Sequence, residues 1–514
     1  MTHTLPVART LPVSRTLDGL LGRTSMYRLV LNSLILLGAV AFILSFTGTL
    51  AFPAADLGAS LLIVMVSTVG SNLLFALLFR VRAHPESSVI TGLLLWFILL
   101  PTSDPKLLVQ VALAGVIASG SKYVFAFRGR HVVNPAAIGA LWLALFEFDV
   151  LGLWWVGTKY LVIVAAVVGF LIVRRTRRVA LVATFLVVVV AVTMARLLID
   201  GGGIGASLEY TFLSTPMVFF AVFMLTEPLT LPPTHREQLV EAVVVGVLFA
   251  IPITVAGYSF GPETALVIGN LLAFALGQRS GIRLTLTGRR AVGGRATEFE
   301  FHSARPLRFA PGQYIELSVP HARADRRGSR RTFSIASSDR DPHRLLVAMT
   351  MAPDGSTFKK SLGAMAIGTD ISATGIAGDF VLPPDRDRPV LLIAGGIGIT
   401  PFLGQLDGLA GGSRYDVVVV YVQRDPADLA YLDLLDDSRA RVVVVTSTPA
   451  TELPPSFENV TVPRIDRISL AAAVPDLQRR DVYVSGPPTF VDEVSRLAAD
   501  QGATRIRRDH FAGY

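Results

Sequence analysis

The sequence feature that most constrains the fold is a series of ten apolar stretches before residue 280. Each is long enough, or nearly so, to cross the roughly 30 Å hydrocarbon core of a bilayer as a helix. They lie near residues 26–50, 57–80, 87–101, 106–126, 134–148, 158–173, 179–198, 210–225, 237–256 and 262–278. The composition agrees, because 52% of the 514 residues are hydrophobic and only 17% are charged. The sequence predicts a polytopic α-helical membrane bundle of about ten helices over residues 26–278.

The distribution of arginine predicts the orientation of this bundle. Alternate connections carry basic clusters, among them Arg80, Arg82 and the run at 174–178, whereas the intervening connections are nearly free of arginine. The positive-inside rule then places both termini in the cytoplasm of a bacterium, with the bundle in the inner membrane. Residues 1–25 are polar and basic and lack the apolar core of a signal peptide, so we expect a cytoplasmic tail. Because topology explains the net charge of +8, no nucleic-acid partner is predicted.

After residue 280 the pattern changes to that of a soluble domain. Short alternating stretches over 281–383 predict a small antiparallel barrel. Over 386–514, buried apolar runs separated by helical stretches predict a parallel α/β sheet. The border lies near "PPDRDRP", residues 383–389.

A glycine-rich turn in this second part predicts a phosphate site. In "AGGIGITPFLG", Gly395, Gly396 and Gly398 allow the backbone to turn tightly at a helix start and approach a pyrophosphate. Four further motifs accompany it in order: "RRTFSIASS", "DGSTFKKSL", "GIAGDFVL" and "YVSGPPTF". The second of these offers another phosphate cradle, made by Gly355, Ser356 and Thr357. An ordinary turn explains any one motif but not five in sequence.

Residues 281–514 resemble the ferredoxin–NADP reductase superfamily, in which an FAD-binding barrel precedes a nicotinamide-nucleotide domain. The Arg-x-aromatic-Ser motif of that family matches Arg331, Thr332, Phe333 and Ser334. The resemblance implies that Arg331 binds the FAD pyrophosphate, that Phe333 packs on the isoalloxazine, and that Ser334 forms a hydrogen bond near its N5.

The nucleotide half carries the remaining motifs of this resemblance. The Gly-Gly-x-Gly-x-Thr-Pro motif matches residues 395–401, which implies that Thr400 and Pro401 lie beside the nicotinamide nucleotide. The usual Cys-Gly-Pro is Ser485-Gly486-Pro487 here, so slower or altered hydride transfer is expected. Tyr514 resembles the terminal aromatic residue that covers the flavin in some members, and a disordered last residue is the alternative. The catalytic candidates are Ser334, Ser485 and Tyr514.

The absence of arginine, cysteine and histidine at certain places bears on the nucleotide preference and on the other cofactors. No arginine follows the third parallel strand in "TSTPATELPP", and Arg424 is expected to orient a ribose or a helix start, so NADH is favoured over NADPH. The absence of cysteine excludes an iron–sulfur cluster held by thiolates. A stacked pair of haems is not expected, because His84, His131 and His235 all fall in predicted cytoplasmic turns. No metal site is predicted.

The membrane half resembles the B subunit of sodium-translocating NADH:quinone reductase and the D subunit of the Rnf complex. The similarity rests on "ITGLLLWFILLP", "GSKYVF", "RHVVNPAAIG" and "FFAVFMLTEPLTLP", between residues 90 and 232. It implies FMN or riboflavin among the helices, with Lys122, Asn134, Thr226 and Glu227 as candidate contacts. Two alternatives stay open: Lys122 extends to the membrane interface, and Asn134 only caps a helix.

The pattern that carries covalent FMN in that family is not reproduced. "WWVGTK" contains Thr158 but lacks the expected Asp and Ala, so we expect a non-covalent flavin with Thr158 as an outer candidate. For Trp154 and Trp155 an interfacial aromatic belt is the favoured interpretation.

Together these patterns predict a membrane flavoprotein oxidoreductase. It would oxidise cytoplasmic NAD(P)H through FAD and pass electrons to a flavin in the membrane domain. A quinone or an extracytoplasmic redox partner would receive them. The alternative is a membrane-anchored NAD(P)H:flavin or ferric reductase whose helices carry no cofactor. An ion pump is a third class, for which the sequence indicates no ion site.

Overall fold

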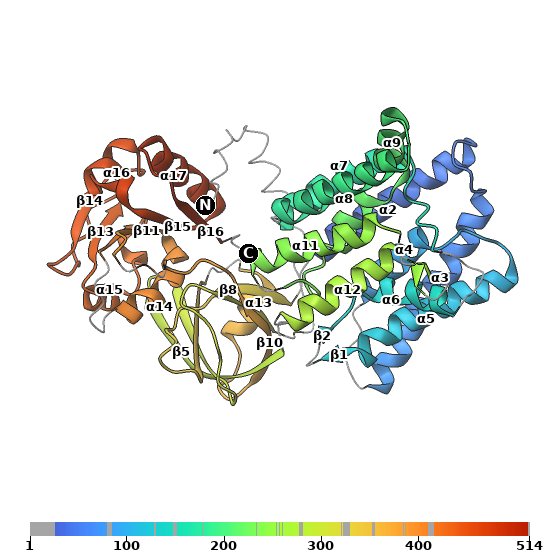
Figure 1. Ribbon diagram of the computed structural model, residues 1–514. Coiled ribbons are helices and arrows are strands. Elements are labelled where there is room, and N and C mark those ends of the chain that lie inside the picture. The colour runs from blue at the N-terminus through green and yellow to red at the C-terminus, as the bar shows by residue number, and fades with distance from the viewer. Residues whose placement is uncertain are drawn as a thin grey trace. The chain divides into compact units, whose positions relative to one another are not determined.

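Helices occupy all ten apolar stretches in the computed structural model (Figure 1). The structure describes residues 26–79, 85–127, 130–146, 152–176, 178–232, 234–252, 254–255, 258–259, 261–276, 281–319, 321, 329–351, 355–383, 385, 387–409 and 416–511. The chain divides near residue 280 into two units, which we call the membrane unit (described from residue 26 to 276) and the reductase unit (described from 281 to 511).

The membrane unit contains helices of different lengths. The helices are α2 (Met26–Phe46), α3 (Ala54–Leu78), α4 (Pro85–Ile98), α5 (Pro105–Val124), α6 (Pro135–Leu145), α7 (Leu161–Thr176), α8 (Val179–Ile199), α11 (His235–Ala250) and α12 (Pro262–Ala275). Between α8 and α11 lies a bent series of α9 (Ile204–Glu209), η1 (Tyr210–Ser214), α10 (Met217–Phe219) and η2 (Phe220–Met224). Two short strand pairs complete the unit: β1 (Ala126–Phe127) with β2 (Arg130–His131), and β3 (Thr254–Val255) with β4 (Tyr258–Ser259).

Only some of these helices have the length and composition of a membrane span. Among the described residues four qualify, α2, α3, α5 and α8, and a fifth span results if the bent series counts as one. The series bends by 45° at a break that contains Pro216, which cannot continue the preceding hydrogen-bond ladder. The expected bundle of about ten spanning helices is therefore not confirmed, and four or five spans are what the helix lengths support.

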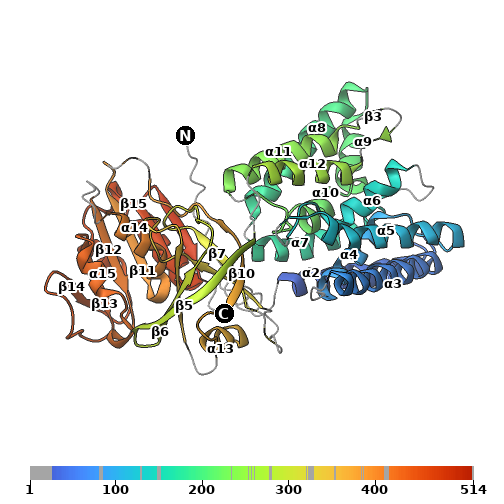
Figure 2. The ribbon, with the colours of Figure 1, turned by 90° about the horizontal axis from the view of Figure 1, so that it is seen from below.

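Caps and small residues explain how these helices start and pack. Asp104 caps α5 by accepting the backbone N–H of Lys106 at 2.8 Å, directly before a proline in the first turn. Helices α3, α4 and α5 lie side by side (Figure 2). A Cβ on Gly139 of α6 would lie 2.7 Å from the carbonyl oxygen of Ala114 on α5. Only a glycine allows the two backbones to approach so closely.

The reductase unit begins with a six-stranded antiparallel sheet, as the alternating pattern predicted. Its order is β8 (Arg330–Ser334), β7 (Tyr314–Ser318), β10 (Asp370–Ala377), β5 (Gly281–Gly293), β6 (Ala296–His302), β9 (Arg344–Thr350). Alternate side chains such as Phe299 and Phe301 are fully buried in one core, because successive residues of a strand face opposite sides. Helix α13 (Thr357–Gly363) contributes Phe358 to the same core.

A six-stranded parallel sheet follows, also as predicted. Its order is β14 (Glu458–Thr461), β13 (Arg441–Thr446), β12 (Val417–Val422), β11 (Val390–Gly395), β15 (Asp481–Gly486), β16 (Ile506–His510). One face packs on α14 (Thr400–Leu409) and α15 (Leu432–Asp437), the other on α16 (Arg467–Ala473) and α17 (Pro488–Asp500), as Figure 1 shows. Short helical turns at η3 (Gly396–Ile399), η4 (Pro426–Asp428) and η5 (Leu477–Arg479) connect these elements. The carboxyl ends of the central strands form the edge at which ligands of such sheets bind.

Candidate functional site

A cleft of about 810 Å³ runs between the antiparallel sheet and the edge of the parallel sheet. Both halves of the reductase unit contribute to its wall, and several of the predicted contact residues are among them: Arg331, Thr332, Phe333, Gly395, Gly396 and Pro487. A drug-sized or nucleotide-sized ligand needs a cleft of several hundred Å³. The cleft is large enough for such a molecule.

The glycine turn after β11 is positioned by close backbone packing. A Cβ on Gly398 would lie 2.5 Å from the carbonyl oxygen of Ser485, so the turns after β11 and β15 touch. Gly396 has φ +57°, a left-handed conformation that favours glycine. Thr400 begins α14 and its hydroxyl donates to the carbonyl of Ile397 at 3.0 Å. Gly395 and Gly396 therefore face the cleft, whereas Gly398, Thr400 and Pro401 build the turn and the helix start behind them.

The opposite wall places a cation and an aromatic ring together. Arg331 is only 8% exposed, and its guanidinium carbon lies 5.3 Å from the ring centre of Phe358. Phe333 stacks on the same ring at 5.8 Å. The hydroxyl of Ser334 donates to Asp509 Oδ2 at 3.2 Å. A guanidinium facing an open glycine turn is a donor set suited to a pyrophosphate, so these residues fit FAD and a nicotinamide nucleotide.

The predicted second phosphate cradle does not reach the wall of the cleft. Ser356 caps α13, and the hydroxyl of Thr357 lies 2.9 Å from His321 Nε2. Gly355, Ser356 and Thr357 are absent from the residues that line the cleft, where Phe358 and Lys359 appear instead.

The end of β15 and the C-terminal strand close the cleft. The hydroxyl of Ser485 is buried and has no hydrogen-bond partner in the described part of the chain. Gly486 accepts the backbone N–H of Phe511 at 2.8 Å, which holds the Phe511 ring at the wall. Tyr514 lies outside the described residues. Sequence reasoning missed Phe511 and Asp509, although "DHFAGY" offered a second aromatic residue three positions before the terminus.

The residues that line the cleft near β13 bear on the argument for NADH. Thr446, the last residue of β13, and Ser447, which follows it, line the cleft, as do Arg424 and Arg464. Arg464 comes after the next strand, β14, and pairs with Glu493 of α17. The loop after β13 lacks arginine, whereas two arginines from neighbouring loops line the same cleft. The preference for NADH over NADPH stays a prediction.

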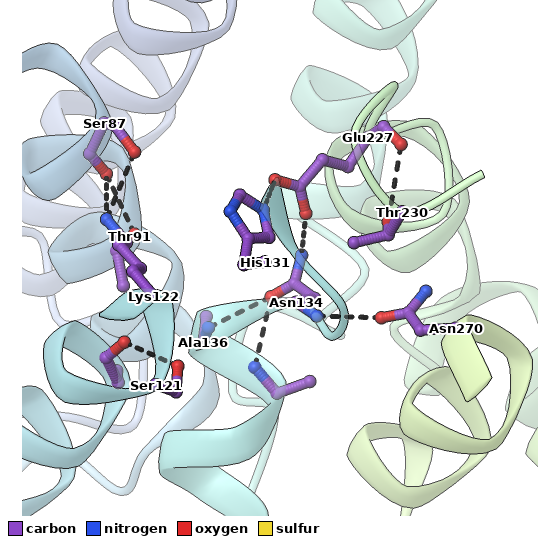
Figure 3. Close-up of polar contacts among 12 residues, drawn as sticks. Ser87, Thr91, Ser121, Lys122, His131, Asn134, Ala136, Glu227, Thr230 and Asn270 are labelled. Carbon is purple, nitrogen blue, oxygen red and sulfur yellow. Dashed lines mark hydrogen bonds and ion pairs between the residues drawn. The ribbon is translucent and has the colours of Figure 1, made fainter. Parts of the chain in front are cut away.

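The membrane unit holds a separate polar cluster around Glu227, shown in Figure 3. Asn134 Nδ2 donates to Glu227 Oε2 at 2.8 Å, and His131 Nε2 lies 2.9 Å from Glu227 Oε1. Asn134 Oδ1 also accepts the backbone N–H groups of Ala136 and Ala137, so the same side chain caps α6. Asn134 therefore caps the helix and also bonds to Glu227, and its proposed contact with a flavin stays a prediction. We call His131, Asn134 and Glu227 the Glu227 cluster.

Lys122 bonds to Ser87 rather than to Glu227. Its ammonium donates to the carbonyl and the hydroxyl of Ser87, each at 3.1 Å (Figure 3). The carboxylate of Glu227 is engaged by the nearer His131 and Asn134 instead. The contact to Ser87 on α4 also shows that Lys122 turns into the bundle rather than toward the membrane interface.

A small cavity adjoins the Glu227 cluster and limits what it holds. Its volume is about 50 Å³, and its polar wall consists of Ser87, Thr91, Asn134, Thr226 and Glu227. The hydroxyl of Thr226 donates to the carbonyl of Val222 at 2.6 Å. Pockets for drug-sized ligands measure about 300 Å³ or more, so a flavin ring does not fit here in this conformation. No step through a membrane flavin is derived from it.

The outer tryptophans do not form an interfacial belt. Trp154 and Trp155 are 4% and 3% exposed, and their indole N–H groups donate to Glu263 Oε2 at 2.8 Å and to the carbonyl of Trp96 at 2.5 Å. Packing and hydrogen bonding inside the bundle therefore replace the expected contact with lipid headgroups. The hydroxyl of Thr158 is buried and has no hydrogen-bond partner among the described residues.

Comparisons with known proteins place the reductase unit among electron-transfer reductases. Residues 392–496 match the oxidoreductase NAD-binding domain family. The chain is 27% identical over 206 residues to the reductase component of propane 2-monooxygenase from Rhodococcus jostii, covering 38% of this chain and 53% of the relative. It is 28% identical over 232 residues to the toluate 1,2-dioxygenase electron transfer component of Pseudomonas putida, covering 44% and 65%.

Among solved structures, the Amycolatopsis cytochrome P450 reductase GcoB aligns with a TM-score of 0.38 and 25% identity, over 46% of this chain and 71% of the other. The two relatives named are a reductase component and an electron transfer component, consistent with a flavin oxidoreductase, and the C-terminal part of this chain is similar to them. The chain spans about half to two thirds of the length of the two relatives named. The family match lies within the reductase unit, so the resemblance of the membrane unit stays a prediction.

Proposed function

We propose that the protein is a membrane flavoprotein that oxidises NAD(P)H through FAD and delivers the electrons into its membrane unit. The proposal rests on the cleft of the reductase unit. Arg331, Phe333 and the Gly395–Gly396 turn all line this cleft. Bound FAD would accept a hydride from NAD(P)H and release the two electrons singly. We place the protein in the bacterial inner membrane with both termini in the cytoplasm.

The residues of the cleft have separable tasks in this proposal. Arg331 and the N–H groups of the glycine turn neutralise phosphate charge. Phe333 and Phe511 supply flat apolar surfaces that exclude water from a ring system. Ser334, held by Asp509 at 3.2 Å, presents a hydroxyl whose orientation is set by that carboxylate. Ser485, whose hydroxyl has no hydrogen-bond partner in the described residues, has a donor available for a bound nucleotide.

The membrane assignment rests on the outer faces of the helices. Large apolar side chains are exposed on several helices: Ile43 and Phe46 on α2, Leu62 and Leu77 on α3, Val109 on α5, Ile163 on α7 and Val187 on α8. Apolar surface of this extent is costly in water and favourable in lipid. For the acceptor in this unit we propose a non-covalent FMN or riboflavin, although the 50 Å³ cavity beside the Glu227 cluster is too small to hold it in this conformation. As the final acceptor we propose a quinone or an extracytoplasmic redox partner.

Purification with flavin identification tests the proposal. We expect FAD plus at least one FMN or riboflavin per chain, and NAD(P)H oxidation that reduces a quinone or a membrane-impermeant acceptor supplied outside. Comparing NADH with NADPH in the same assay measures the nucleotide preference. Arg331→Ala should lose FAD while the membrane flavin is retained.

The alternative is a reductase with a cofactor-free anchor. One FAD per chain, together with activity restricted to cytoplasmic acceptors, would establish it and exclude the membrane flavin. A haem absorption band in the pure protein would contradict both versions.

A further inference from the structure

Glu241 is a carboxylate buried in the membrane unit that the proposed function does not use. It lies on α11 and is 0% exposed. Neither carboxylate oxygen has a hydrogen-bond partner among the described residues. Water is excluded from both oxygens, and an unpaired ionised carboxylate in such surroundings is strongly unfavourable.

The groups around Glu241 do not supply a strong counter-charge. Helices α8 and α12 pack against α11. The titratable groups on these two helices are Arg178 and Arg196 at the two ends of α8 and Glu263 at the far end of α12. Arg178 is within electrostatic range of Glu241 but donates to Gln238 Oε1 at 2.9 Å. A neutral, protonated carboxyl avoids the cost of burying a negative charge without a counter-charge.

Glu241 is better suited to bind a proton than a metal ion. Oxygen-seeking cations require six or more oxygen ligands. The described residues contain no group of three or more acidic, histidine or cysteine side chains placed to bind a metal. On α11 itself, Glu237 and Gln238 lie one helical turn before Glu241.

Asn270 connects Glu241 to the Glu227 cluster. The residue before it, Gly269, approaches the carboxylate: a Cβ there would lie 3.5 Å from Glu241 Oε1. Asn270 Oδ1 accepts the backbone N–H of Asn134 at 2.8 Å, and Asn134 in turn donates to Glu227 (Figure 3). A chain of two asparagines thus leads from the helix turn beside Glu241 to Glu227, and polar groups in such a network influence one another.

We propose that Glu241 is a proton-binding site inside the membrane unit and that its occupancy responds to charge at the Glu227 cluster. The reaction is the binding of one proton to one carboxylate oxygen, with no other bond made or broken. Negative charge that arrives near Glu227 favours the protonated form, and by reciprocity the proton favours the arrival of that charge.

Thermal unfolding of the purified full-length protein in detergent tests the binding site. Glu241→Gln copies the protonated form and needs no proton. We expect its Tm to equal or exceed that of the natural protein, with a gap that widens as pH rises, because unfolding then releases the proton of Glu241. Glu209→Gln, which changes an exposed glutamate, should show no such gap. A Glu241→Gln protein with a lower Tm, or a gap independent of pH, would overturn the proposal.

Labelling with dicyclohexylcarbodiimide, which modifies protonated carboxyls in apolar surroundings, tests the link. Peptide mass spectrometry should find the label on Glu241, in a fraction that falls with rising pH and is absent from Glu241→Gln. Glu227→Gln removes the nearby negative charge and should move the half-labelling point to lower pH. An unchanged half-point would refute the link to the cluster. Neither readout requires turnover, so both are independent of the proposed reductase activity.

Discussion

At the scale of single residues, Gly398 shows how a nucleotide site depends on an absent side chain. Its hypothetical Cβ would lie 2.5 Å from the carbonyl oxygen of Ser485 and 2.7 Å from the Cα of Gly486. Both contacts are with backbone, which cannot turn aside as a flexible side chain does. The turn that carries Gly395 and Gly396 to the cleft therefore depends on glycine at this position.

Gly398→Ala is expected to separate the ends of β11 and β15. Such overpacking destabilises a protein by about 1–3 kcal/mol, and displacement of the turn should lower kcat/KM for NAD(P)H on the order of 10²-fold. Gly408→Ala in the exposed part of α14, where no heavy atom lies within 4 Å, is the matched control. Steady-state oxidation and thermal unfolding measure both effects. Similar kinetics in the two variants would show that the turn does not contribute to the nucleotide site.

At the scale of elements, the start of α6 combines capping with side-chain recognition. Asn134 places its carbonyl oxygen over the first turn of the helix and its amide nitrogen against Glu227. An asparagine supplies an acceptor and a donor at once. Serine offers a cap acceptor without the amide donor, and aspartate offers a cap acceptor with a charge that repels Glu227.

Substitutions at Asn134 should therefore separate the two roles. Asn134→Ser retains a cap but loses a hydrogen bond to a charged group, worth about 1.5–3 kcal/mol. Asn134→Asp retains the cap and adds repulsion, so its Tm should be lower than that of Asn134→Ser. Asp104→Asn at the start of α5 keeps its cap and should change Tm little. Equal Tm values for the serine and aspartate variants would mean that the Glu227 contact contributes nothing.

At the scale of the whole molecule, an ion pair joins the two sheets of the reductase unit. Arg295, in the turn between β5 and β6, contacts Asp428 in η4 with its Nη2 2.5 Å from Oδ2. Hydrogen bonds from the Arg295 guanidinium hold the pKa of Asp428 below its usual range. The cleft lies between the two sheets, so this pair helps to maintain its walls, which include both residues.

The lowered pKa of Asp428 implies a pH dependence. Its stabilising effect is fully present above the unfolded value of about 3.9 and is lost as pH falls through the lower folded value. Asp428→Asn should lower Tm at neutral pH, and its difference from the natural protein should disappear in acid. Asp433→Asn, on the exposed side of α15, should show no pH-dependent difference. A difference that persists unchanged in acid would mean that charge pairing is not its cause.

Much of the element order and several site residues could be predicted from the sequence. Hydrophobic periodicity identifies helices and strands because it depends on neighbouring residues alone, and all ten apolar stretches contain a helix. Glycine and arginine motifs identified Arg331, Phe333, Gly395 and Gly396, because the backbone conformation and charge they need are local. The length of a helix depends on more than neighbouring residues. Among the described residues, only four or five helices are long and apolar enough to span a membrane.

The sequence by itself determined that apolar helices precede an antiparallel sheet and a parallel α/β domain, and which glycine turn lines the cleft. Only the tertiary structure decided that Arg464 and Arg424 line the same cleft, that Glu227 pairs with His131 rather than Lys122, and that Glu241 is buried with no hydrogen-bond partner among the described residues. These contacts join residues distant in the chain or depend on the packing of separate helices. Pairing and burial of this kind depend on packing in three dimensions, which no local pattern records.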